Sequence, residues 1–472
     1  MSTKTESMDG WWSRIDRNQK FVFVVATLAW MFDCLDQQLF NLARSPAMAS
    51  LLEPGQDPKY YGGLSTSIFV LGWATGGMIF GSLGDRYGRA RMLAVTVLLY
   101  SLATGLSALS VHFADFAAYR FITGLGVGGV FGLSVALVAD SLPDVVRPRA
   151  LGVLQSLSAV GNVSAGLIGM GVAALQLGAG SWKWLFLIGA LPAMLTAFIQ
   201  FRLKEPEKWV VARARAEARG HKAGSYRVLF KHPVWRRHAL LGMLLSCAGV
   251  VGLWGIGVFS NDMVGDIVAH SLGRKPGITP EQIQDGKKWW MSINLLCFNG
   301  GAFFGMMAFT RVAEALGRRK AFAGFYLGAL VVTVFVFQKL NTTTDILWMA
   351  PLMGFFQLSV FAGMSIYLPE LFPTSLRSTG TSFCYNVGRY LAATGPFTLG
   401  LLAANLARGA EAKAVAAAGA GAAQAVVDAA KVVARIDAFR DAASIMCVIF
   451  LLGLVVLPFL PETKGQPLPE ED

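Results

Sequence analysis

The chain has 472 residues, of which 54% are hydrophobic and 15% are charged, and its mean hydropathy is +0.51. This composition argues against a water-soluble protein and favours one embedded in a membrane. The net charge of +12 does not indicate a nucleic-acid partner, because most Lys and Arg fall in segments that would face the cytoplasm if the N-terminus lies there.

About twelve apolar runs of about 20 residues follow one another, and each can cross a bilayer as a helix. A β-barrel would show short alternating segments instead. The segment before the first run is polar and charged, so we expect no cleavable signal peptide. The pattern predicts a multi-pass protein of the cell (inner) membrane, monomeric, with both termini in the cytoplasm.

The first run, which starts near Phe21, carries Asp33 and Asp36 on neighbouring parts of one helix face. A charge inside a bilayer costs about 2.5–3.5 kcal/mol on insertion scales, and by default it marks function. Two carboxylates this close in a low dielectric do not both ionise easily, so one of them can exchange a proton near neutral pH. We expect this pair to handle a proton, with Gln37 or its neighbour Gln38 facing a substrate cavity.

Two charged blocks recur at an offset of about 230 residues, which predicts a transporter built from two similar halves. The blocks are Asp85-x-x-Gly88-Arg89 with Glu314-x-x-Gly317-Arg318, and Asp140-x-x-Pro143-x-x-x-Arg147 with Glu370-x-x-Pro373-x-x-x-Arg377. The fold class is therefore predicted as all-α integral membrane, with twelve transmembrane helices in two pseudo-symmetric six-helix bundles.

Opposite charges in these blocks, at the cytoplasmic turns, can bridge the halves when that side is closed. We expect Asp140 to pair with Arg149 or Arg147, and Glu370 with Arg377. A purely topological role for the arginines is the alternative. The predicted gate residues are Gly81, Asp85, Arg86, Gly88, Arg89, Asp140, Arg149, Glu314, Arg318, Glu370 and Arg377.

The fourth run contains Arg120, about one turn inside its external end, at the depth of the aspartates of the first run. We hypothesise that Asp36 alternates between a proton and Arg120. A static ion pair that holds the two helices together is the alternative. The glycines at 124–129 lie within this run and not after a strand, so they indicate close helix packing and not dinucleotide binding.

The basic stretch 204–238 separates an N-terminal bundle, residues 1–203, from a C-terminal bundle, residues 239–472. We expect this stretch to be a cytoplasmic linker that touches anionic lipid.

A third block shows where the second half is longer. Pro206-Glu207 at the end of the sixth run returns as Pro461-Glu462 at an offset of about 255, so the second half has gained about 25 residues. The Ala- and Gly-rich stretch near 409–434 is the obvious insert, and its charged residues place it outside the membrane.

Arg389 is an isolated charge in the eleventh run. A lone guanidinium facing a water-filled cavity would suit a carboxylate, whereas an ion pair with an aspartate of the first run, or snorkelling to the interface, are the alternatives. Other residues could face the same cavity or only bond neighbouring helices. They are Gln155, Asn294, Asn299, Tyr385 and Asn386.

The five cysteines lie in apolar runs without a CxxC pair, and no histidine lies away from a helix end. This pattern predicts no metal site and no cofactor. No P-loop is present, so we expect neither ATP-driven transport nor an enzyme.

These residues resemble the major facilitator superfamily over essentially the whole chain. Residues 81–89 are similar to the family's loop signature between helices 2 and 3, and residues 461–465 to the helix 12 ending of its sugar-porter-like branch. Asp33-x-x-Asp36 resembles the aromatic-acid and sialic-acid proton symporters, although Cys34-Leu35 replaces their glycine and aromatic residue.

The resemblance implies that Asp36 and Arg120 form a coupling pair and that Gln155 contacts substrate. The double-glutamine motif of sugar porters is missing from the seventh run, which argues against a simple hexose carrier. We therefore expect proton-coupled symport of a small organic anion, which is an aromatic, sugar-derived or other carboxylic acid, by alternating access. Symport of a neutral sugar or polyol is the alternative, followed by drug efflux and a nutrient sensor that does not transport.

Overall fold

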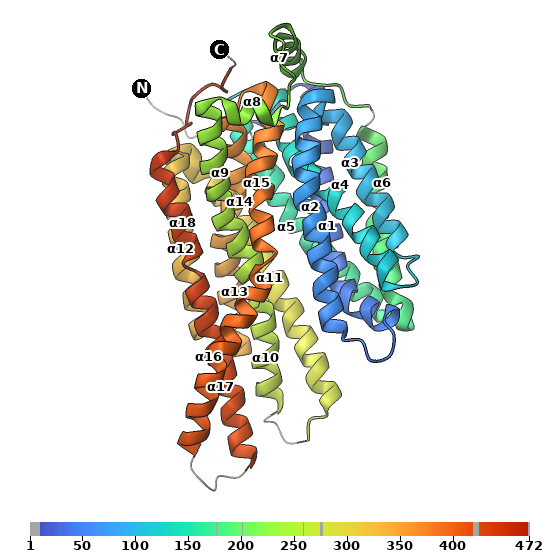
Figure 1. Ribbon diagram of the computed structural model, residues 1–472, viewed down its shortest axis with the longest axis vertical. Helices are drawn as coiled ribbons and strands as arrows, with labels where there is room; N and C mark the ends of the chain where they lie inside the picture. The colour runs from blue at the N-terminus through green and yellow to red at the C-terminus, as the bar shows by residue number, and fades with distance from the viewer. Residues whose placement is uncertain are drawn as a thin grey trace.

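The apolar runs fold as helices that stand side by side along one long axis (Figure 1). The computed structural model describes residues 10–175, 177–200, 202–257, 259–273, 277–418 and 424–470. No strand occurs in these residues, and 9 helical stretches within them are long and apolar enough to cross a membrane. The predicted all-α membrane fold is confirmed.

Six single helices form the first half of the chain. They are α1 (Arg17–Leu51), α2 (Pro58–Tyr87), α3 (Arg89–Ser107), α4 (Phe113–Ser141), α5 (Arg147–Ala174) and α6 (Ser181–Gln200). The first of them begins with a capping box, in which Asp16 Oδ1 accepts from the Gln19 backbone N–H at 2.8 Å and Gln19 Oε1 accepts from the Asp16 N–H at 3.1 Å.

The second half also has six segments, of which four are broken into two helices. They are α9 (Pro233–Gly252) with α10 (Phe259–Gly273), α11 (Pro280–Leu316), α12 (Arg318–Lys339), α13 (Thr343–Gln357) with α14 (Ser359–Tyr367), α15 (Arg377–Ala392) with α16 (Gly395–Ala418), and α17 (Gln424–Met446) with α18 (Ile449–Val456). Between the halves lie α7 (Glu207–Ala218) and α8 (Tyr226–Lys231). Short turns of 3-10 or π helix occur at Trp12–Arg14, Gly178–Gly180, Leu253–Gly257, Leu368–Leu371, Thr374–Leu376 and Leu457–Phe459.

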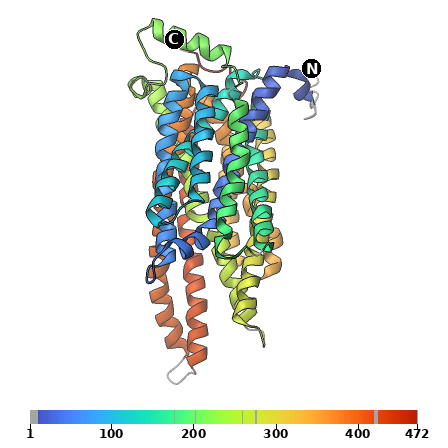
Figure 2. The same cartoon turned by 90° about the vertical axis from the view of Figure 1, so that its right-hand side faces the viewer.

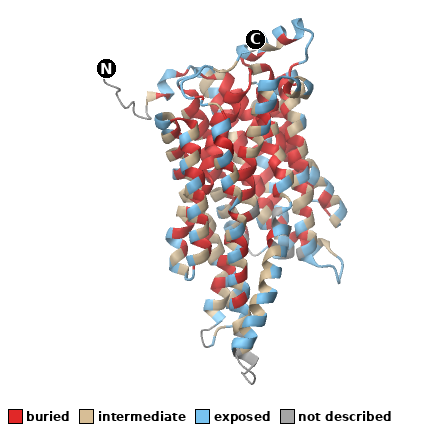
Figure 3. Ribbon diagram, turned by 60° about the vertical axis from the view of Figure 1, so that its left-hand side comes forward, coloured by how far each residue is buried: buried red, intermediate tan, exposed pale blue. Residues whose placement is uncertain are grey.

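The two halves meet mainly where α2 packs against α15 and α5 packs against α11, and α4 also contacts α15 and α5 also contacts α14. The α7 and α8 helices lie at one end of the bundle, which we call the linker end (Figure 1). The chain enters α1 and leaves α18 at this same end (Figure 2). Buried residues are concentrated toward the linker end, whereas the opposite end, which we call the far end, is more exposed (Figure 3).

The stretch 409–434 does not form a separate element in its described part. It forms the end of α16 and the beginning of α17, which pack against each other and project beyond most other helices at the far end (Figures 1 and 2). Residues 419–423 of this stretch, and residues 1–9 of the predicted N-terminal bundle, lie outside the described residues. Whether the stretch is external stays a prediction.

Candidate functional site

Asp36 of α1 and Arg120 of α4 are both fully buried, and their opposite charges attract each other. Arg120 Nη2 donates to Ser107 Oγ at 2.6 Å and to Thr123 Oγ1 at 3.0 Å. Its guanidinium also lies 4.7 Å from the ring centroid of Phe186. The Thr104 side chain interacts with the Asp36 carboxylate and lies 3.5 Å from Arg120 Nη2, whereas Arg120 Nη1 lacks a hydrogen-bond partner within the described chain. The two charges therefore interact, although no direct ion pair joins the two side chains among the described residues.

Arg389 of α15 is held between two aromatic rings from opposite halves. Its guanidinium carbon lies 3.9 Å from the ring centroid of Trp73 in α2 and 4.2 Å from that of Tyr385. Arg389 Nη1 donates to the Tyr385 carbonyl at 2.8 Å and to Asn386 Oδ1 at 3.2 Å. These contacts fix the plane of the guanidinium and leave Nε without a partner among the described residues.

Asp33 is the carboxylate whose charge acts on Arg389. Asp33 Oδ2 accepts a hydrogen bond from Gln37 Nε2 at 2.9 Å, whereas Oδ1 has no partner in the part of the chain that the structure describes. The two aspartates of α1 thus have different arginines as neighbours. Asp33 is associated with Arg389 of the second half, and Asp36 with Arg120 of the first.

An aromatic layer surrounds Arg389, and sequence reasoning missed most of it. Phe131 of α4 stacks on Tyr385 at a centroid distance of 3.7 Å, and Trp30 of α1 packs on Phe131 at 5.2 Å. Trp73 meets Trp254 edge to face at 5.8 Å. A tryptophan in an apolar run carries no sequence signal that separates a cavity wall from a lipid-facing position.

Several buried polar atoms of α1, α2, α5 and α15 have no hydrogen bond within the described residues. They are Trp30 Nε1, Asp33 Oδ1, Trp73 Nε1, Gln155 Oε1 and Arg389 Nε. Buried polar groups in folded proteins nearly always have a partner, so these atoms are candidates for contact with water or a ligand.

Three of the predicted cavity residues form hydrogen bonds within the protein, and their role in a substrate cavity stays a prediction. Asn294 Nδ2 donates to Asn261 Oδ1 at 3.1 Å, and Asn386 Nδ2 to the Ser382 carbonyl at 3.0 Å. Asn299 accepts at 2.8 Å from Nδ2 of Asn162, which lies in α5 of the opposite half. The Asn294 bond joins α11 with α10, the Asn386 bond lies within α15, and the Asn299 bond joins the two halves.

At the linker end, each half contains one ion pair between its two repeated blocks. Arg89 pairs with Asp140 in the first half. Arg318 pairs with Glu370 in the second, with Nη2 to Oε1 at 2.8 Å and Nε to Oε2 at 3.1 Å. The predicted pairing of Asp140 with Arg147 or Arg149, and of Glu370 with Arg377, is wrong, because each carboxylate pairs with the arginine that follows the turn glycine of its own half.

Contacts between the halves complete this network. Asp85 accepts from the backbone N–H groups of Ser378 at 3.1 Å and Thr379 at 2.8 Å, which lie in the first turn of α15. On the other side, Arg149 Nε donates to Glu314 Oε1 at 3.1 Å, and Arg377 reaches across to Asp140. The linker end is therefore closed in this structure.

Arg86 and Arg147 form no ion pair between the halves among the described residues, although the charge of Glu370 in the second half acts on Arg147. Arg86 is exposed and stacks over its neighbour Tyr87, at 5.1 Å from the ring centroid. Arg147 pairs with Asp144 at 2.6 Å.

The same backbone geometry explains the glycine in the turn before α3 and the glycine in the turn before α12. Gly88 and Gly317 have φ values of 117° and 95°, in the region that favours glycine. A Cβ at Gly88 would also collide with Glu205, whose carboxylate accepts from the backbone N–H groups of Arg89 at 2.8 Å and Arg91 at 3.0 Å. Glu462 does the same for α12, accepting from the Arg318 N–H at 2.9 Å. The third repeat is thus a pair of helix caps, and Glu205, not Glu207, is the structural equivalent of Glu462.

Gly81 allows close contact between the halves, because a Cβ there would lie 2.5 Å from the Ser382 side chain of α15.

Comparison with known proteins agrees with this architecture. A family model described as Major Facilitator Superfamily matches residues 26–274. The chain is 26% identical to a putative metabolite transport protein of Haemophilus influenzae, over 92% of this chain and 94% of that protein. It is 27% identical to the niacin transporter NiaP of Acinetobacter baylyi (77% and 83%), and 26% identical to the cis,cis-muconate transport protein of the same organism (81% and 87%).

Among solved structures, the proton:xylose symporter XylE aligns with a TM-score of 0.68 at 18% identity, over 95% of this chain and 97% of that chain. At this level of identity, the similarity shows a shared fold.

Proposed function

Because this chain belongs to the Major Facilitator Superfamily, we propose that it moves a small organic anion together with protons by alternating access. In this proposal the linker end faces the cytoplasm, an orientation that the positive-inside bias of the sequence supports. The structure then corresponds to a transporter whose cytoplasmic side is closed.

The anion proposal rests on one observation, the guanidinium of Arg389 held between Trp73 and Tyr385 with Nε unpartnered in the described chain. A rigid, buried guanidinium fork suits a carboxylate better than a hydroxyl group. The aromatic rings beside it offer an apolar surface for the body of such a molecule. Niacin and cis,cis-muconate, which two relatives are named for, are both carboxylic acids.

The charge balance around Arg389 supports the proposed proton coupling. With Asp33 ionised, its negative charge competes with an incoming anion for Arg389. Protonation of Asp33 removes that competition, so that an anion and a proton enter the site together. Asp36 and Arg120 form a second pair one helical turn along α1, in which Asp36 can pass or hold a proton while the charge of Arg120 and the Thr104 side chain act on its carboxylate.

Symport of a neutral sugar or polyol remains the alternative for the same fold. It would leave the charge of Arg389 without a counterpart in the substrate, at the desolvation cost of a buried cation.

Uptake into proteoliposomes tests the proposal. The purified protein is reconstituted, an inside-alkaline pH gradient is imposed, and uptake of radiolabelled cis,cis-muconate and nicotinate is compared with that of xylose, with protein-free liposomes as the control. We expect gradient-driven uptake of at least one carboxylate that other carboxylates inhibit. Uptake of xylose alone would support the alternative, and carboxylate uptake that ignores the gradient would remove proton coupling.

A further inference from the structure

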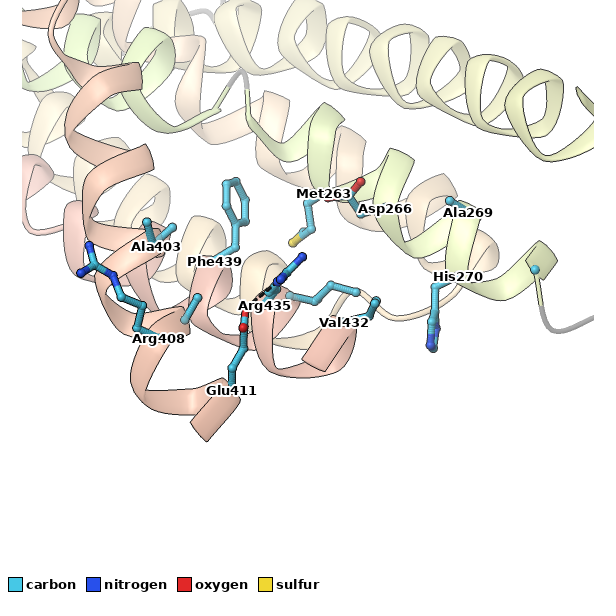
Figure 4. A pocket seen from close by; sticks show the side chains of 14 residues that line it. Met263, Asp266, Ala269, His270, Ala403, Arg408, Glu411, Val432, Arg435 and Phe439 are labelled. Carbon is cyan, nitrogen blue, oxygen red and sulfur yellow. Dashed lines mark hydrogen bonds and ion pairs between the residues drawn. The ribbon is translucent and has the colours of Figure 1, made fainter. Parts of the chain in front are cut away.

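At the far end, α10, α16 and α17 enclose a groove of about 930 Å³. Figure 4 shows its side chains, which come from these three helices. A volume of this size lies within the usual range of small-molecule sites, about 300–1,000 Å³. None of its lining residues belongs to the pairs around Arg120 or Arg389.

The base of the groove is apolar. Met263 of α10 is buried, and Ile436 and Phe439 of α17 are half-buried beside it. On the facing side of α16 the lining residues Ala403 and Ala407 present only methyl groups, so these small side chains leave room between the helices. Such walls bind hydrocarbon or an aromatic ring and offer little to a small inorganic ion.

Not every charged residue of the groove has an oppositely charged partner in the described part of the chain. Arg435 pairs with Glu411 inside it, with Nε to Oε1 at 2.5 Å (Figure 4). Asp266 pairs with Lys287 outside it at 3.6 Å. Arg408 donates only to the neutral Asn405 Oδ1, at 3.0 Å, and has no carboxylate partner among the described residues. One cation therefore remains for a ligand, next to an apolar surface.

We propose that this groove binds an organic carboxylate with an apolar body, whose carboxylate lies on Arg408 and whose hydrocarbon lies on Phe439 and Ile436. The guanidinium fork suits a carboxylate, and the apolar base selects against a compact anion. The site is separate from the proposed transport site and does not require that transport occurs. Its outer wall contains Glu411, Val432 and part of α17, and these belong to the stretch by which the second half exceeds the first.

The test uses the full-length protein in phosphatidylcholine nanodiscs and follows binding of 4-fluorobenzoate by ¹⁹F NMR. The Arg389→Gln variant isolates the far-end groove, because it removes the proposed central anion site. We expect this variant to bind 4-fluorobenzoate, and the additional change Arg408→Gln to weaken that binding about tenfold or more. Arg408→Lys should keep part of the affinity, since the positive charge remains.

The matched control is Lys413→Gln, which removes one positive charge from an exposed position of the same helix that does not line the groove. It should leave binding in the Arg389→Gln background unchanged. Equal binding with and without Arg408→Gln would overturn the proposal, as would an Arg389→Gln variant that binds no 4-fluorobenzoate. If Arg389→Gln binds as tightly and at as many sites as the unchanged protein, the central anion site fails while the groove stands.

The phosphate group of a lipid could also bind to Arg408. Changing the lipid composition of the nanodisc distinguishes such a lipid from a free carboxylate. Replacing half of the phosphatidylcholine by phosphatidylglycerol should leave 4-fluorobenzoate binding by the Arg389→Gln variant unchanged. Loss of that binding, together with phosphatidylglycerol retained in native mass spectra only when Arg408 is present, would show a lipid site instead and contradict the proposal. Unchanged thermal unfolding of each variant excludes misfolding as the cause.

Discussion

Asp85 of α2 accepts a hydrogen bond from the Thr379 backbone N–H of α15 at 2.8 Å, so a side chain of one half caps a helix of the other. The Thr379 hydroxyl donates to the same carboxylate oxygen at 2.7 Å. Asp85 also pairs with Arg89 at 3.1 Å. Because a helix N-terminus carries a partial positive charge that attracts a carboxylate, this residue ties the closure of the linker end to the ion pairs of the first half.

Asp85→Asn should therefore favour opening of the linker end. Hydrogen bonds to a charged group are worth about 1.5–3 kcal/mol each, so loss of the charge shifts the open–closed equilibrium by about tenfold or more. Spin labels at the exposed positions Arg86 and Lys320, one in each half, would report the change as a longer distance between labels. With the labels kept in place, a substitution at exposed Lys208 should not lengthen it, and an unchanged distance in Asp85→Asn would refute the capping role.

Arg149 and Glu314 form a partly exposed ion pair between the halves, at 3.1 Å and with side chains 26% and 24% exposed. Reversing one charge, by Arg149→Glu or Glu314→Arg, places like charges together and should weaken closure. Reversing both should restore it, with a coupling energy of about 0.5–1 kcal/mol after allowance for solvent screening. The open fraction of the four proteins is measured from the same label distances. Strictly additive effects would mean that the two residues do not interact.

Gly88→Ala should lower the melting temperature, because alanine would have to adopt a φ of 117° and its Cβ would displace the Glu205 cap of α3. The expected cost is about 1–3 kcal/mol. The matched control is Gly324→Ala in α12, where nothing lies within 4 Å of the added Cβ and alanine favours the helix. The melting temperatures of both variants are measured by thermal unfolding in detergent. Equal melting temperatures would contradict this explanation of the turn.

The stability of the folded protein should depend on pH through the ionisation of the Glu462 carboxyl group. Burial alone would raise the pKa of Glu462, but hydrogen bonds from the backbone N–H groups of Arg318, Arg319 and Lys464 and the charge of Arg318 hold the pKa below its ordinary value of 4.5. A carboxyl whose pKa is lower in the folded state stabilises the fold above its unfolded value and loses that effect as the pH falls through the folded one.

Glu462→Gln should therefore lower the melting temperature at pH 7 and have a smaller effect near pH 4. Thermal unfolding of both proteins at the two pH values measures the difference. An effect of the substitution that is equal at both pH values would show that the carboxylate charge does not support the cap of α12.

The sequence predicted the helices and the repeated blocks well, because bilayer-length apolar runs and fixed offsets are local signals. It did not predict which charges pair, since Arg89 reaches Asp140 through the packing of α3 on α4 and not through spacing along one helix. Glu205 was missed for a related reason. Matching Pro206-Glu207 with Pro461-Glu462 aligns Glu207 with Glu462, whereas the folded chain uses the glutamate two residues earlier as the cap.

The aromatic clamp around Arg389 could not be found from one sequence either. Trp73 and Tyr385 are about 310 residues apart in the chain, and their approach depends on the contact of α2 with α15, a tertiary relationship that no local pattern encodes.

The pH dependence of anion binding tests the central claim most directly. Binding of nicotinate to the purified protein is measured by isothermal titration calorimetry between pH 5.5 and 8.5, for the unchanged protein and for Asp33→Asn. We predict that affinity falls as the pH rises in the unchanged protein and stays nearly constant in Asp33→Asn, because the uncharged amide mimics the protonated carboxyl beside Arg389. An equally steep pH dependence in both proteins would contradict the exchange of a proton on Asp33 for an anion on Arg389.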